Sequence, residues 1–251
     1  MRKILVCSAK GGVGKTTTAI NLSSALNKLN NDVTLVDCNF TTPNVGLYYG
    51  ISNVGKTIHD IMNKKGNIHK SVYLHKSGTK IIPGSISLSS LKKVRPEFLK
   101  QKLNKLNSDF IILDSSAGLG REALASLDAC DELLVVVNPE LPSVADALKL
   151  INIAEDIKKE IIGVVVSRKR GKFEMKMDAI EGLLKYPIIG VIPEDEHVKK
   201  ALVMEESVYD LYPKSKSGRA YKKLAHYLMG EVFYEEKKSL FNDFLEILGW
   251  K

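Results

Sequence analysis

Cysteine and tryptophan are scarce in this chain of 251 residues, which contains three cysteines and one tryptophan. The cysteines, Cys7, Cys38 and Cys130, are odd in number and have no Cys-x-x-Cys or Cys-x-Cys spacing. This usage argues against a disulfide-stapled fold and indicates a reducing, cytoplasmic compartment. The histidines between residues 59 and 75 also lack ligand spacing, so the sequence predicts no histidine-based metal site.

Long apolar runs are also absent. No stretch is long enough to span a bilayer, and the N-terminus has too few apolar residues for a signal peptide. A hydrophobic content of 44% and a charged content of 26% are instead typical of a soluble globular protein with one large α/β domain. The net charge of +8 fits either simple solubility or an anionic partner such as DNA or a lipid surface. The densest basic cluster is Arg168-Lys169-Arg170 with Lys172.

A glycine-rich loop is the most specific motif, because it stands between an apolar run at residues 4–7 and a helical pattern at residues 18–26. Strand, glycine loop and helix in this order are typical of a phosphate-binding loop, whose N–H groups face the anion. The loop residues are Lys10, Gly11, Gly12, Val13, Gly14, Lys15, Thr16 and Thr17. We expect Lys15 to neutralise the β- and γ-phosphates of ATP, and the Thr16 hydroxyl to bind Mg²⁺.

Two further predicted strands end in an aspartate. The apolar run at residues 33–36 precedes Asp37, and the run at residues 110–113 precedes Asp114 in the Walker B form. Ligands of open α/β sheets bind beyond the carboxyl ends of the strands, so both carboxylates should face the phosphate site. We expect Asp114 to accept hydrogen bonds from Mg²⁺-bound water and from Thr16.

The loop also carries a second lysine, Lys10, at its first position, and in this it resembles the deviant Walker A loop of the MinD/ParA family of ATPases. In that family the first lysine reaches the nucleotide of a partner subunit, and the resemblance implies the same role for Lys10. The resemblance covers residues 1–230 and is greatest to archaeal MinD-like proteins. It implies a doubly wound, SIMIBI-type P-loop NTPase fold, with a mainly parallel sheet flanked by helices. We therefore predict one ATPase domain over residues 1–234.

The segment at residues 37–44 resembles switch I of the family but departs from it at one position. The family pattern is two aspartates separated by one residue. Asp37 matches the first, which helps to hold the Mg²⁺ water shell, whereas Asn39 replaces the second, which orients the attacking water. An amide offers one acceptor oxygen and no negative charge. With Lys10, Lys15, Asp37 and Asn39 as the catalytic set, we expect ATP hydrolysis that is slow or depends on a partner.

Three further segments resemble family sites. Residues 115–120 resemble switch II and keep Gly118, where the backbone approaches the γ-phosphate. The strand at residues 161–167 ends where the family has an adenine-binding asparagine followed by arginine, and Ser167 and Arg168 stand there. A hydroxyl can bond adenine with fewer groups than an amide offers. Residues 193–195 match a family segment whose backbone borders the base, so we include Pro193, Glu194 and Asp195 in the predicted ATP site.

The remaining periodicity gives local predictions. Residues 57–62 indicate a short helix, and residues 72–75 and 80–84 indicate two paired strands. One helix is predicted from Pro96 to Leu106. After a strand at residues 132–137, a helix should bury one face. That face is Ala145, Leu148, Ile151 and Ala154.

The C-terminal segment, residues 235–251, is predicted to form an amphipathic helix. Its apolar face is Leu240, Phe241, Phe244, Leu245, Ile247 and Leu248. In MinD such a helix docks the ATP-bound dimer on a membrane, and dimerisation doubles the contact. Asp243 and Glu246 on the polar face would fit an anionic bilayer poorly, so the chain's own domain or a groove on a protein partner are the alternatives.

Together these features predict a MinD-like ATPase that forms a homodimer with Mg²⁺ and ATP and acts as a spatial-positioning switch in cell division or polar organisation. It would be cytoplasmic, with peripheral membrane binding as one option. Two alternatives are a ParA-like DNA partition ATPase, favoured by the charge of +8, and a nucleotide-bound scaffold with little turnover, suggested by Asn39. An iron–sulfur or nickel carrier would have only Cys130 as a ligand from each subunit.

Overall fold

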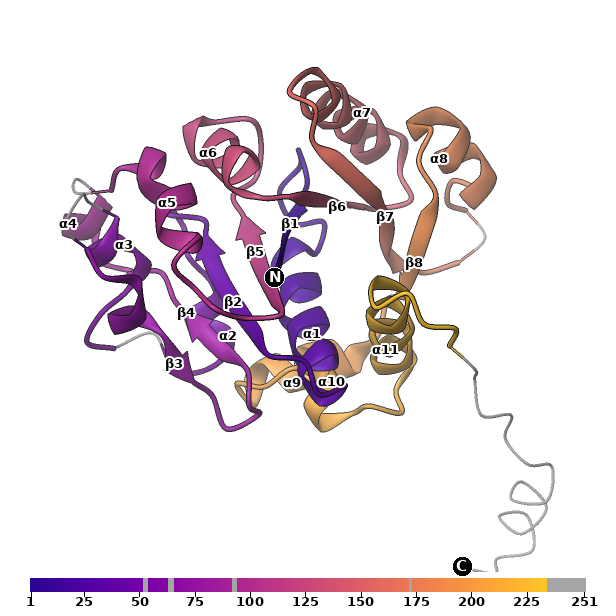
Figure 1. Cartoon of the computed structure of the whole chain (residues 1–251). Coiled ribbons are helices and arrows are strands. Elements are labelled where there is room, and N and C mark those ends of the chain that lie inside the picture. The colour runs from indigo at the N-terminus through magenta and orange to yellow at the C-terminus, as the bar shows by residue number, and fades with distance from the viewer. Residues whose placement is uncertain (52–53, 63–65, 92–93, 172, 234–251) are drawn as a thin grey trace, which may run out of the picture.

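The structure, a computed structural model, describes residues 1–51, 54–62, 66–91, 94–171 and 173–233. Within them an eight-stranded sheet forms the middle layer, and helices cover both of its faces (Figure 1). The strand order is β3-β4-β2-β5-β1-β6-β7-β8, and every neighbouring pair is parallel except β3 with β4. The strands are β1 (Arg2–Cys7), β2 (Val33–Cys38), β3 (Tyr73–Leu74), β4 (Lys80–Ile82), β5 (Phe110–Ser115), β6 (Glu132–Val137), β7 (Glu160–Lys169) and β8 (Ile188–Pro193).

Two apolar clusters, one on each face of the sheet, hold the layers together. Helices α1 (Lys15–Lys28), α2 (Val45–Tyr48), α9 (Glu196–Val203), α10 (Val208–Leu211) and α11 (Lys216–Leu228) contribute to one cluster. Helices α3 (Ile58–Ile61), α5 (Leu99–Leu103), α6 (Arg121–Ala129), α7 (Leu141–Asp156) and α8 (Met177–Leu184) contribute to the other. A short helix α4 (Leu88–Leu91) and 3₁₀ turns at Ile68–Ser71 and Pro96–Phe98 complete the described elements. The central strands are apolar along their length because both faces are covered.

The doubly wound, mainly parallel fold and the hairpin of residues 72–84 are confirmed. Two local predictions are wrong. The helix predicted over residues 96–106 is a 3₁₀ turn followed by α5, which ends at Leu103. For α7 the prediction is wrong only in part: Ile151 and Ala154 are buried as predicted, whereas Ala145 is exposed and Val144 and Leu150 are buried in addition. The Ser143 hydroxyl, which accepts a 3.0 Å hydrogen bond from the Asn138 N–H, helps to fix this orientation. The predicted C-terminal helix of residues 235–251 lies outside the described residues.

The chain changes direction across the sheet at β1, which lies between β5 and β6. The next strand, β2, lies beyond β5, and β6 to β8 lie on the other side. Such a switch point opens a crevice at the carboxyl ends of the strands, where α/β proteins bind ligands. Asp37 and Asp114 are paired in register on β2 and β5 at this edge. The fold therefore brings the two predicted Mg²⁺ residues next to the loop that follows β1.

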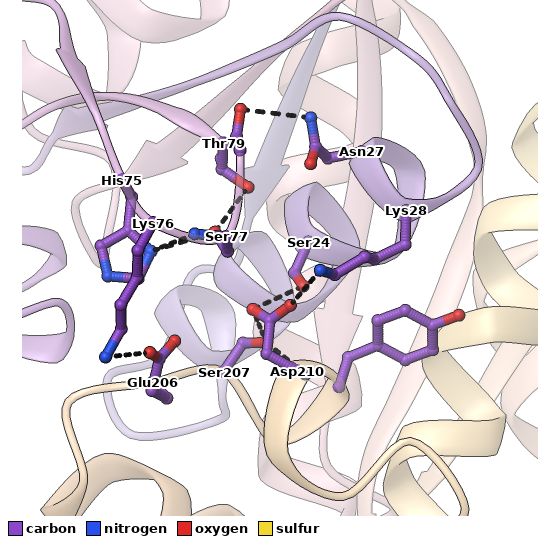
Figure 2. Close-up of polar contacts among 12 residues, drawn as sticks. Ser24, Asn27, Lys28, His75, Lys76, Ser77, Thr79, Glu206, Ser207 and Asp210 are labelled. Atoms are coloured by element: carbon purple, nitrogen blue, oxygen red, sulfur yellow. Dashed lines mark hydrogen bonds and ion pairs between the residues drawn. The ribbon is translucent and has the colours of Figure 1, made fainter.

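A polar cluster at the other end of α1 fastens α10 to that helix (Figure 2). The Ser24 hydroxyl donates a 2.8 Å hydrogen bond to Asp210 Oδ2, and Lys28 Nζ lies 3.6 Å from Oδ1. Beside them Lys76, between β3 and β4, forms a 2.6 Å ion pair with Glu206. Both carboxylates are largely buried, and buried charges need such partners. These contacts thus hold the segment between β8 and α11 against the C-terminal end of α1.

Candidate nucleotide site

The loop after β1 has the backbone that phosphate binding requires. Gly12 and Gly14 have φ values of 76° and 103°, a region that side-chain-bearing residues rarely adopt. A Cβ on Gly14 would also lie 2.7 Å from the Ser167 hydroxyl. Because α1 starts at Lys15, the helix N-terminus and the loop N–H groups open on the same side. The glycines are therefore needed both for the turn and for close contact with β7.

The two lysines of the loop differ in their surroundings. Lys15 is 8% exposed, its Nζ donates a 3.4 Å hydrogen bond to the Lys10 carbonyl, and burial lowers its pKa. The Lys10 side chain is 43% exposed, and its Nζ lies 3.7 Å from the Glu140 carboxylate. Lys15 is thus fixed inside its own phosphate loop, whereas among the described residues the Lys10 ammonium group has a surface ion pair as its one partner, and such pairs are weak.

The predicted Mg²⁺ residues meet beside the loop. The Thr16 hydroxyl donates a 2.7 Å hydrogen bond to Asp114 Oδ2. Asp37 and Asp114 are fully buried; burial raises the pKa of Asp114 to about 7, and burial together with the Asp114 charge raises the pKa of Asp37. Within the described part of the chain no donor reaches the buried Asp114 Oδ1. A hydroxyl and two buried carboxylates, one of them with an oxygen that has no described donor, fit a hard cation and its water shell.

Asn39 is turned toward its own loop. Its Nδ2 donates a 2.7 Å hydrogen bond to the Thr42 carbonyl, and its Oδ1 accepts one of 3.2 Å from the Thr42 N–H. Asp37 holds the same segment, since its carboxylate accepts from the N–H groups of Asn39 and Val45 at 3.1 and 3.0 Å. Thr41, from this loop, donates a 2.5 Å hydrogen bond through its hydroxyl to a carboxylate on α6. The carbonyl group of the Asn39 amide is therefore engaged locally.

The phosphate loop, Asn39 and Arg168 line one cavity of about 390 Å³. Gly118, with φ of 82°, follows β5 at its edge, and a Cβ on Gly11 would lie 4.0 Å from Ala117. The structure therefore brings the predicted loop, the switch I segment and the switch II segment together. Arg168 donates a 3.0 Å hydrogen bond to the Gly12 carbonyl and joins this cavity to the next.

A second cavity, of about 170 Å³, adjoins the loop at the position predicted for the base. Of the predicted residues, it is lined by Gly14, Thr17, Ser167, Arg168, Pro193, Glu194 and Asp195. The carboxylate of Asp195 does not face a ligand. It accepts hydrogen bonds from His197 and from the N–H and hydroxyl of Ser217, and these bonds hold its pKa below the usual range. Asp195 thus caps α9 and ties it to α11, so only its backbone remains for the base.

Sequence reasoning missed several residues of this base cavity. They are Tyr48, Ile192, Val198, Lys199, Leu202 and Tyr221. Val198 and Leu202 have helical i, i+4 spacing directly after the Pro-Glu-Asp segment, which was the available signal. Asn138, also not predicted, bridges β6 to β7, since its Nδ2 donates to the Ser167 carbonyl at 3.0 Å.

The structure also bears on the alternatives. Arg168 and Arg170 lie 3.5 and 3.9 Å from the Glu194 carboxylate, and Lys169 pairs with Glu174, so two carboxylates offset part of the charge of these three cations; Lys172 lies outside the described residues. The three cysteines are buried. Because Cys130 is only 2% exposed, its thiol is not placed to bind a metal or cluster shared between two subunits. Across the described ranges no three His, Cys, Asp or Glu side chains form a metal cluster. No helix in those ranges is both long and apolar enough to cross a membrane.

Comparison with known proteins agrees with this geometry. Residues 4–208 match the CobQ/CobB/MinD/ParA nucleotide binding domain. The chain therefore belongs to this family of nucleotide-binding proteins. It is 35% identical to the ATP-binding protein MJ0547 of Methanocaldococcus jannaschii, over 96% of this chain and 93% of that protein.

Solved structures give the same result for the fold. The cell division ATPase MinD of Pyrococcus furiosus is similar with a TM-score of 0.88 and 29% identity, over 91% of this chain and 98% of that one. The septum site-determining protein MinD of Pyrococcus horikoshii, in complex with Mg-ADP, is similar with a TM-score of 0.87 and 28% identity, over 90% and 95%. The predicted MinD/ParA family and fold are confirmed, and the family includes ATPases.

Proposed function

We propose that this chain is a cytoplasmic, MinD-like ATPase whose two copies close over two Mg²⁺·ATP molecules and so act as a spatial switch. Lys15 would bind the phosphates within one subunit, and Lys10 would reach the nucleotide of the other. Bound beside Thr16, Asp37 and Asp114, Mg²⁺ would neutralise phosphate charge. The paired state would carry the binding surface that a partner reads, and loss of ATP would dissolve it.

One observation carries the proposal, namely that the two lysines of the loop have different environments. Lys15 is buried, while Lys10 is exposed at the mouth of the loop with one weak ionic partner, Glu140. Glu140 lines a separate cavity, which is also bordered by Leu141 and Phe173, whose side chains are exposed. Exposed apolar side chains beside a charged group are typical of a surface that meets another protein. A second nucleotide-loaded copy would supply phosphate groups that replace this weak partner of Lys10.

Pairing can be tested with Lys10→Ala in the full chain. Light scattering should give a dimer for the wild type with Mg²⁺ and a slowly hydrolysed ATP analogue, and a monomer for the variant. ATP affinity of the monomer should change little, because Lys15 remains. Lys149→Ala, which removes a more exposed lysine with its own ion pair from α7, is the control. Nucleotide-driven pairing that survives in Lys10→Ala would refute the proposal.

We further propose that hydrolysis is slow or waits for a partner. The Asn39 amide is bonded to Thr42 and carries no charge with which to orient the attacking water. Asn39→Asp should raise single-turnover hydrolysis by about 100-fold, at the lower end of what a positioned general base contributes. Thr42→Val, which removes only the Thr42 hydroxyl contacts of the amide and adds no charge, should not. Brisk turnover in the wild type, unchanged in Asn39→Asp, would contradict this step.

A scaffold that retains ATP is the second candidate, because the same Asn39 contacts favour it. The nucleotide recovered after long incubation separates the two, since a scaffold returns ATP and a switch returns ADP. The paired basic cluster at residues 168–170 does not favour a DNA partition ATPase. ATP-dependent DNA binding that weakens steeply with salt would restore that alternative.

A further inference from the structure

A groove of about 500 Å³ runs between β8 and α11, away from the phosphate loop. Figure 1 places α11 beside β8 at one side of the molecule. The groove has an apolar part, in which Val191 and Tyr227 are 40% and 50% exposed. It also has a basic part, made by Lys216, Arg219 and Lys223. This combination suits an occupant that is apolar on one face and acidic on the other.

The groove lies beside the edge strand of the sheet, which proteins commonly cover. β8 is the last strand of the sheet and pairs only with β7 among the described strands. The free edge of a strand is a pairing hazard, and proteins commonly cover it with a helix or loop. The three groove cations also lack a described partner, since none of them forms an ion pair within residues 1–233 where the structure is described.

The chain itself turns toward this groove after α11. Gly230, with φ of 73°, ends the helix in a Schellman motif, in which the Glu231 N–H donates to the His226 carbonyl at 2.9 Å. The Phe233 ring then lies 5.2 Å from the His226 ring and 5.9 Å from Lys222 Nζ. Phe233 lines the groove, so the last described residue has already folded back along α11.

The sequence beyond Phe233 has the matching chemistry. Residues 239–251 carry the apolar face described above, and the same segment with its linker contains four acidic residues, Glu235, Glu236, Asp243 and Glu246, and three lysines, Lys237, Lys238 and Lys251. A helix of this length spans about 20 Å, as α11 does. The linker, residues 234–238, can reach roughly 17 Å when extended. We propose that residues 239–251 dock as an amphipathic helix in the β8–α11 groove of their own chain, with their acidic groups against Arg219 and Lys223.

The single tryptophan, Trp250, reports on docking without a label. The full chain is studied without nucleotide, so the result does not depend on ATP-driven pairing. In the wild type we expect blue-shifted Trp250 emission and weak quenching by iodide, both independent of protein concentration. The double variant Arg219→Glu/Lys223→Glu should shift the emission to the red and raise iodide quenching several-fold. Lys105→Glu/Lys158→Glu, with the same change of charge outside the groove, should resemble the wild type.

A second pair of variants tests the tail. Phe244→Asp should release Trp250, whereas Asn242→Asp, which adds the same charge at a position on the polar face, should not. Asp243→Lys/Glu246→Lys should restore protection in the Arg219→Glu/Lys223→Glu background. Three results would overturn the proposal: Trp250 equally exposed in wild type and groove variant, protection that grows with protein concentration, or protection that requires phosphatidylglycerol vesicles. The second result would indicate another copy as the occupant, and the third a membrane.

Discussion

The two ends of the nucleotide site are built differently. At the phosphate end, consecutive residues of one loop meet buried carboxylates, and the Thr16–Asp114 hydrogen bond of 2.7 Å closes the arrangement. At the base end, α2, β7, β8, α9 and α11 each contribute between one and three residues. There the Asp195 carboxylate accepts hydrogen bonds from the N–H and the hydroxyl of Ser217, so it is occupied within the protein.

This difference shows which part of ligand recognition is fixed by geometry. A triphosphate and its cation carry concentrated charge, which must be met by groups already in place, because reorganising them is costly. A base is a flat, mostly apolar ligand that a cavity can accept with few polar groups. The phosphate end should therefore respond strongly to single substitutions, and the base end weakly.

The largest effect is expected for Lys15→Ala. Removing the buried cation from the phosphates should lower ATP affinity by about 100-fold, since charge-assisted bonds contribute roughly 1.5–3 kcal/mol. Lys199→Ala, at the base cavity, should lower it by no more than about fivefold, because the lysine is solvated there. Titration calorimetry measures both. Equal losses would remove the distinction between the two ends.

Gly14 lies where the two ends meet, so Gly14→Ala tests their boundary. The new methyl group must accept φ of 103° and a 2.7 Å approach to the Ser167 hydroxyl. We expect ATP affinity to fall by about tenfold, as strain of roughly 1–3 kcal/mol implies. Adding Ser167→Gly should rescue it only in part, because the backbone strain remains. Gly120→Ala, where a Cβ would meet no atom within 4 Å, is the control.

The buried carboxylates should make the nucleotide-free protein less stable as pH rises. Because the folded pKa of Asp114, about 7, lies above its ordinary value of 3.8, protons favour the folded state, and stability is lost as pH rises from about 4 through 7. Asp114→Asn should remove this dependence and, without nucleotide, melt above the wild type at pH 8 but not at pH 4. Mg-ATP should stabilise only the wild type. Melting curves at several pH values check this, and a wild type that gains stability between pH 4 and 7 relative to Asp114→Asn would contradict it.

The smallest effect is expected at Ser167. Its hydroxyl borders the base cavity, and loss of one neutral hydrogen bond corresponds to about 1 kcal/mol. Ser167→Ala should therefore lower ATP affinity by roughly fivefold or less, and should change the ATP-to-GTP ratio more than it changes phosphate binding. Competition between the two nucleotides measures this ratio. Ser167→Thr, which keeps the hydroxyl, should retain the wild-type preference.

The same contrast decides what could be predicted from the sequence. The phosphate loop is contiguous, so its composition, flanking strand and helix were enough to locate it. Asp37 and Asp114 followed from the rule that ligands meet the carboxyl ends of parallel strands. The base cavity was predicted only in part, because Tyr48 and Tyr221 are brought together by folding and share no local pattern.

Packing detail was not predictable for a similar reason. The buried face of α7 depends on the hydrogen bond between Ser143 and Asn138, not on periodicity alone. The contacts of Asp210 with Ser24 and Lys28 join residues far apart in the chain (Figure 2). A sequence pattern indicates which residues of one helix or strand are apolar or polar. Long-range contacts such as these depend on how two elements pack against each other.

Pro193 lines both the base cavity and the β8–α11 groove. One strand end thus forms a common wall between two cavities for which we propose different occupants. Binding equilibria that share a wall obey reciprocity: if filling the first cavity changes the affinity of the second by some factor, filling the second changes the first by the same factor. Deleting residues 239–251 and measuring ADP and ATP dissociation constants would therefore give the size of this linkage without observing the tail at all.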